Sequence, residues 1–254
     1  MMPAAALALL VAAVLTGGTI QRLSGMGMGL MISPVFALIF GAAVGVTVAN
    51  ATTILSALII GFVMRAGIDW RRFAIIAPSA LLGTIPGGLL VREMDGGWLG
   101  VLVGATILAA LALTLWADRL TVLPELRHRA WIIPFAAGGA FLNTVSGISA
   151  PVLMIYAIAA RWDQRSFAAT LQPFFVWISL LSVTVKISVG ATPLNELPDP
   201  WVLPLILAAI LAAVAIGSRL AHRVSPQAAR RLAIAVAGLG AVSTLLRGLA
   251  DALG

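Results

Sequence analysis

The stretch SGMGMGL, residues 24–30, interrupts an apolar region that continues on both sides of it. It holds three glycines within five positions, and each glycine weakens a helix by about 1 kcal/mol relative to alanine. Backbone that leaves helical geometry inside a bilayer is tolerated only where protein or a water-filled cavity surrounds it. The stretch therefore predicts a helix that is broken at membrane depth, with the break turned toward the protein interior.

The composition identifies the chain as an integral membrane protein. Of its 254 residues, 61% are hydrophobic and 10% are charged, which is too few charges to cover the surface of a soluble domain. The net charge is +7, but the basic residues lie between apolar runs, as they do in cytoplasmic loops. The sequence has no basic patch with interleaved aromatic residues, so nucleic-acid binding is not expected. Because the chain has no cysteine, thiolate catalysis and cysteine-based metal sites are excluded, and no metal or cofactor is expected.

Six apolar runs are long enough to cross a hydrocarbon core of about 30 Å, which takes roughly 20 helical residues. They cover residues 46–64, 73–91, 98–117, 167–187, 201–218 and 229–246. Two further apolar regions, residues 3–40 and 131–160, are each divided by glycine and small polar residues into two arms. This pattern favours a re-entrant hairpin in each region.

The loop charges predict the orientation of the spans in the membrane. Basic residues dominate loops 65–72, 118–130 and 219–231, which we expect in the cytoplasm, and acidic residues dominate loops 92–97 and 190–200, which we expect outside. Loop 161–166, with Arg161 and Arg165, is then also expected in the cytoplasm. Region 131–160 would begin and end on the cytoplasmic side, and region 3–40 would begin and end outside. Both chain termini are expected to be non-cytoplasmic, in a multi-pass protein of the cell (inner) membrane.

An internal repeat supports this arrangement. A shift of 122 residues superposes four positions of the same or similar type: Ser24 on Ser146, Gly25 on Gly147, Gln21 on Asn143, and Asn50 on Gln172. Residues 1–120 and residues 121–254 would then each hold one hairpin and three spans, an odd number of crossings. The predicted fold is an all-α integral membrane protein of two inverted repeats, an architecture that recurs in transporters with a site near the bilayer midplane.

The two glycine-rich breaks predict an anion site. A helix that starts after each break directs its unpaired N–H groups and its positive dipole end toward the break, and two such ends would hold an anion. A lone glycine motif more often serves close helix packing, but its duplication with an amide before each copy favours a site. The candidate residues are Gln21, Arg22, Ser24, Gly25, Met26, Gly27, Asn50, Asn143, Ser146, Gly147, Ile148, Ser149 and Gln172.

Several longer motifs resemble a known family. SGMGMGLMISPVFAL, ANATTI, GIDWRRF and LLGTIPGGLL are similar to the first half of the TauE/SafE family of sulfite and sulfonate anion exporters, and GGAFLNTVSGISAPVLMIYAIA with RSFAATLQPFF is similar to its second half. The resemblance implies a transporter of small anions, usually an exporter, with substrates such as sulfite, organosulfonates, thiosulfate or small carboxylates. Ser149-Ala150 departs from the family pattern, because many members carry glycines there. A homodimer is left open.

The remaining polar residues bear on mechanism. All nine acidic residues and both histidines fall in loops or at the chain's end, so neither a proton relay nor an intramembrane enzyme is expected. Arg22 could complement an anionic group, pair with backbone carbonyls or reach the membrane surface. Lys186 is expected to be an anchor that reaches the outer surface. These features favour a carrier driven by the membrane potential, with an anion channel as the alternative.

Overall fold

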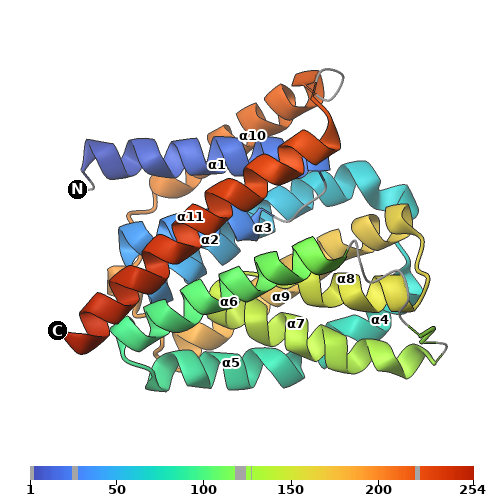
Figure 1. The fold of residues 1–254 in the computed structure, drawn as a ribbon, viewed down its shortest axis with the longest axis horizontal. Coiled ribbons are helices and arrows are strands. Elements are labelled where there is room, and N and C mark those ends of the chain that lie inside the picture. Colours follow the sequence, from blue (N-terminus) through green and yellow to red (C-terminus); the bar gives the residue numbers. More distant parts are fainter. Residues whose placement is uncertain (1–2, 25–27, 118–123, 127, 221–223) are drawn as a thin grey trace.

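The computed structural model describes residues 3–24, 28–117, 124–126, 128–220 and 224–254. All regular structure in these ranges is helical. The α-helices are α1 (Ala4–Ser24), α2 (Gly29–Phe40), α3 (Ala42–Met64), α4 (Trp70–Ser79), α5 (Leu81–Glu93), α6 (Gly96–Ala117), α7 (Ile132–Ser146), α8 (Ala150–Ala159), α9 (Gln164–Ser188), α10 (Val202–Leu220) and α11 (Pro226–Leu253). Most of them run along the long axis of the molecule or at a tilt to it, and α1 begins at the same end of the molecule at which α11 finishes (Figure 1).

Seven segments in the described ranges are long and apolar enough to cross a membrane. They are Ala4–Gln21, Ala42–Gly67, Trp70–Glu93, Gly96–Trp116, Gln164–Ser188, Val202–Leu220 and Arg231–Leu253. Six of them coincide with the predicted spans to within a few residues at most ends. The chain is therefore a multi-pass, all-α membrane protein.

The seventh segment is the first arm of a region that the sequence predicted to be a hairpin. α1 has 21 residues and its partner α2 has 12. At 1.5 Å per residue, α2 is about 18 Å long and covers only part of a bilayer. The second broken region has two short arms, α7 with 15 residues and α8 with 10. Region 3–40 thus pairs a helix of spanning length with a short one, whereas both arms of region 131–160 are short. The inverted relation between the two halves of the chain stays a prediction.

Side-chain caps define three helix starts. The Asp69 carboxylate accepts a hydrogen bond from the Arg72 N–H at 3.0 Å at the start of α4, and the Asp163 carboxylate accepts one from the Ser166 N–H at 2.9 Å at the start of α9. The Ser225 hydroxyl caps α11 in the same way. All three caps lie in loops that were predicted to be cytoplasmic, where the chain must re-enter the membrane. Such caps contribute about 1 kcal/mol each.

Small residues allow α6 and α11 to pack closely. A Cβ added at Gly100 of α6 would lie 3.1 Å from the Gly248 Cα of α11, and one added at Gly104 would lie 2.7 Å from the Leu245 backbone nitrogen. Lipid tails are as apolar as leucine, so helices in a membrane associate through close van der Waals packing rather than through the hydrophobic effect. The glycine stripe of α6 therefore fixes α11 against it.

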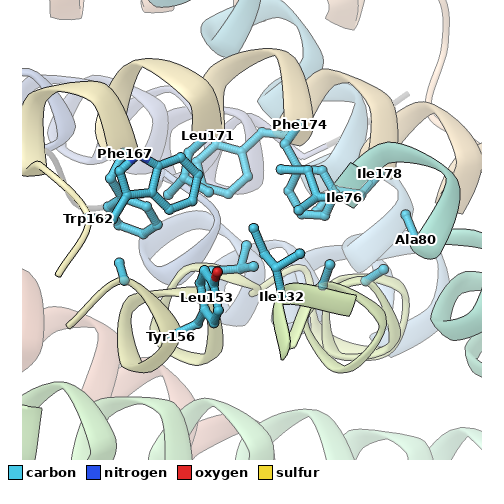
Figure 2. Packing of buried hydrophobic residues seen from close by; sticks show 14 of the residues in the cluster. Ile76, Ala80, Ile132, Leu153, Tyr156, Trp162, Phe167, Leu171, Phe174 and Ile178 are labelled. Carbon is cyan, nitrogen blue, oxygen red and sulfur yellow. The ribbon is translucent and has the colours of Figure 1, made fainter. Parts of the chain in front are cut away.

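The helix α9 connects the second broken region to the rest of the bundle. Figure 2 shows Phe167, Leu171, Phe174 and Ile178 of α9 facing α7 and α8, with Ile76 of α4 beside them. Phe174 and Ile178 are fully buried. α9 also packs on α3 and α5. This position lets α9 contribute both to the wall of a cavity and to the interface with the first half of the chain.

Candidate functional site

The two glycine-rich breaks are in contact. A Cβ added at Gly29 would overlap the carbonyl oxygen of Gly147, so α2 begins directly against the end of α7. Gly147 has a φ of +76°, in the left-handed region that favours glycine, and its N–H donates to the Asn143 carbonyl at 2.8 Å. A Cβ there would overlap the Ser33 hydroxyl of α2. Only glycine fits at both positions, and the described parts of the two predicted tips meet here.

A cavity of about 130 Å³ lies beside this contact. That space is many times the roughly 10–15 Å³ that a single water requires, and it suits a compact anion. Six of the thirteen candidate residues line it: Gln21, Asn143, Gly147, Ile148, Ser149 and Gln172. None of the described residues that line it is acidic.

Two helix starts face the cavity. α2 starts at Gly29 and α8 at Ala150, both of which line it, and the residue before each start makes no side-chain capping hydrogen bond. The first N–H groups of a helix have no partner within the helix, and the dipole places the equivalent of about half a positive charge there. Pro151 supplies no N–H, and Gly29, Leu30 and Ala150, at the two helix starts, line the cavity. This arrangement favours a bound anion.

Three amide side chains leave polar atoms unpaired around the same cavity. Gln21 Oε1, Asn143 Nδ2 and Gln172 Oε1 are buried and have no hydrogen-bond partner among the described residues. Gln172 Nε2 is occupied, since it donates to the Ala168 carbonyl at 3.1 Å. A buried polar group without a partner costs about 1–3 kcal/mol. All three residues line the cavity, which favours a polar ligand there.

Two candidate residues lie away from the cavity. Asn50 is fully buried, and its Nδ2 donates to the Ser182 hydroxyl at 2.7 Å and to the Asn143 carbonyl at 3.4 Å. Ser146 donates to the Leu142 carbonyl at 2.8 Å within its own helix. Asn50 and Gln172 occupy corresponding positions in the sequence repeat, yet of the two only Gln172 lines the cavity. Gly25, Met26 and Gly27, and the side chains of Arg22 and Ser24, lie outside the described residues.

Other lining residues lie outside the thirteen candidates. Thr53 shares a face of α3 with Asn50, so helical spacing alone directs it to the same site, and it lines the cavity, whereas Thr114, from the end of α6, carries no signal in the sequence. The apolar wall comes from α8 and from the first half of α9, where Phe167, Leu171 and Phe175 lie. These side chains are typical of a helix core, and only the packing of α9 against the second broken region brings them to the site.

The family model of the sulfite exporter TauE/SafE matches residues 9–244. The chain therefore belongs to this family, whose members are membrane transporters and not enzymes. No curated protein and no solved structure matches the chain.

Proposed function

We propose that the protein exports small anions, such as sulfite, organosulfonates or related sulfur oxyanions, by alternating access around the cavity between the two glycine tips. The observation that carries the proposal is the meeting of two uncapped helix starts and three unpaired amides at one space. Neutral donors can hold a monoanion or compact dianion without burying a countercharge. Membership of the sulfite exporter family supports the substrate class.

The position of the cavity supports an inward-facing state. On α9 the lining residues fall between Gln164 and Phe175, in the half of the helix that follows Arg161 and the loop predicted to be cytoplasmic. In the other half of α9, the hydrogen bond from Asn50 to Ser182 holds α3 against α9. The cavity would therefore exchange its anion with the cytoplasm, while the contact of α3 with α9 would close the route to the outer face.

The membrane potential supplies the driving force. An interior that is negative by 100 mV favours the exit of a monovalent anion by roughly 2.3 kcal/mol, or about 50-fold in concentration. Export then needs no buried proton carrier. In this orientation the start of α1 and the end of α11 both lie outside the cytoplasm. A homodimer is compatible with the proposal and is not required by it.

Transport of radiolabelled sulfite into and out of proteoliposomes tests the proposal. We expect saturable, counterflow-competent flux that responds to an imposed potential and is unaffected by a pH gradient of equal size. Protein-free liposomes give the background rate. Flux that follows the pH gradient and ignores the potential would refute the driving force. Unitary currents in planar bilayers would show a channel instead of a carrier.

A further inference from the structure

The only lysine of the chain is buried in the bundle. Lys186, near the end of α9, is 0% exposed, and its Nζ has no hydrogen-bond partner among the described residues. The expectation that it reaches the outer surface as an anchor is wrong, because its side chain turns into the bundle. A cation inside a membrane helix is costly and marks a functional position. The other fifteen basic residues are arginines, and this buried position alone carries the compact ammonium group.

A line of buried polar residues connects Lys186 to the cavity. Asn143 lines the cavity, and its carbonyl accepts from Asn50 Nδ2, which also donates to Ser182 of α9. Lys186 follows Ser182 by one helical turn, so the two side chains project from the same face of α9. We call Asn143, Asn50, Ser182 and Lys186 the polar track.

The polar track continues toward the end of α9. Thr47, one turn before Asn50 on α3, shares a hydrogen bond of 3.0 Å with Thr192, and the Thr192 N–H donates to the Lys186 carbonyl at 3.2 Å. Both threonines are buried. Thr192 lies in the loop that was predicted to be outside the cell. The track therefore leads from the cavity toward the face opposite the cytoplasmic half of α9.

Among the residues that the structure describes, the polar track has unused hydrogen-bonding atoms and no acidic partner. Asn50 Oδ1 and the Ser179 hydroxyl, which lies on the Lys186 face of α9, are buried without a partner among the described residues. Neither α3 nor α9 contains an acidic residue. On α5, Glu93 is 73% exposed in its side chain and pairs with Arg92. A buried ammonium group without a carboxylate is suited to meet an anion.

We propose that Lys186 forms a second anion-binding position, for the same oxyanion, on the outward half of the transport path. The inference rests on the proposed function and deepens it. In this structure the position is closed, because the bond from Asn50 to Ser182 holds α3 against α9 and the bond between Thr47 and Thr192 holds α3 against the loop that follows α9. Separation of α3 from α9 opens the track to the outside and lets the ammonium group receive the anion from the cavity.

Substitution of Lys186 tests the proposal. We expect Lys186→Gln to lower sulfite flux in proteoliposomes by about tenfold or more, since a charge-assisted contact is lost, and Lys186→Arg to retain part of it. Equilibrium binding of sulfite to the cavity in detergent should stay within about twofold of wild type, because the cavity is lined without Lys186. Arg92→Gln is the matched control, because it removes one positive charge from an exposed side chain at the predicted outer end of α5. Wild-type flux in Lys186→Gln would overturn the inference, whereas absence of flux in the wild type would overturn the proposed function.

A second measurement on the wild-type protein covers the case in which Lys186→Gln does not fold. A membrane-impermeant amine-reactive ester can modify only Lys186 and the N-terminal amine, and peptide mapping separates the two. We expect Lys186 to be labelled from the outer side of proteoliposomes and not from the inner side, with saturating sulfite slowing the labelling. Labelling from the inner side, or labelling that sulfite does not change, would overturn the inference.

Discussion

Two buried asparagines that touch each other are expected to respond in opposite ways to the same substitution. Asn143 Nδ2 has no partner, whereas Asn50 Nδ2 donates to Ser182 at 2.7 Å and to the Asn143 carbonyl at 3.4 Å. Leucine has a similar size and shape but no polar atoms. Asn143→Leu removes an unsatisfied donor and keeps the backbone carbonyl that Asn50 uses. Asn50→Leu removes a satisfied donor and leaves the Ser182 hydroxyl without its partner.

The magnitudes follow from these contacts. A hydrogen bond to a charged ligand contributes about 1.5–3 kcal/mol, so Asn143→Leu should weaken sulfite binding by roughly 10- to 150-fold. Removal of a buried, unpaired donor relieves part of a desolvation cost of about 1–3 kcal/mol, so the ligand-free protein should melt at the same or a higher temperature. Asn50→Leu should lower stability by about 1–3 kcal/mol and leave the intrinsic affinity of the folded cavity nearly unchanged.

Isothermal titration with sulfite and thermal melting in detergent, with and without sulfite, measure both quantities on both variants. Leu58→Ala, at an exposed position on α3, is the control for substitution on a membrane helix. A result in which Asn143→Leu destabilises the ligand-free protein and binds sulfite as tightly as wild type would refute the reasoning. Asn143 would then serve the packing of the bundle and not the ligand.

Three further substitutions test the packing that positions the site. Gly147→Ala should lower stability by about 1–3 kcal/mol through left-handed backbone strain, and the overlap with Ser33 adds to this cost. Gly138→Ala, within α7, should be tolerated, because the nearest atom to its added Cβ lies 3.8 Å away. Equal melting temperatures for the two variants would contradict this. Gly104→Ala should loosen α6 from α11, where its Cβ would lie 2.7 Å from Leu245, and lower the melting temperature relative to Gly96→Ala, which has open space around it. Asp163→Ala should cost about 1 kcal/mol by removing the cap of α9, and Asp163→Asn should restore most of that loss; a variant as stable as wild type would show that the cap is not needed.

The sequence predicts much of this fold because a bilayer imposes simple requirements. Apolar runs of about 20 residues mark spans, and glycine clusters within them mark the breaks that became the ends of α1 and α7. Length alone did not separate a hairpin arm from a spanning helix in α1, whose 21 residues allow either. The contact between Gly29 and Gly147 follows from the rule that irregular backbone must be enclosed by protein.

The failures concern the direction of individual side chains. Lys186 sits near the end of a predicted span, and only the packing of α3 and α5 on α9 shows that it turns inward. Asn50 matches Gln172 in the repeat, but the neighbouring Ser182 captures its amide. The Ser146 hydroxyl bonds back to the preceding turn, a local option open to any serine in a helix. Such choices depend on tertiary neighbours that hydropathy and spacing do not encode.

The position of the bound anion is the decisive observation, and selenite, the selenium counterpart of sulfite, makes it visible by anomalous diffraction. Crystals of the wild-type protein soaked in selenite should give a selenium peak in the cavity, next to Gly29, Asn143 and Ser149, and Asn143→Leu crystals should lose it. Selenium peaks only outside this cavity, or a peak that Asn143→Leu leaves at full height, would contradict the account.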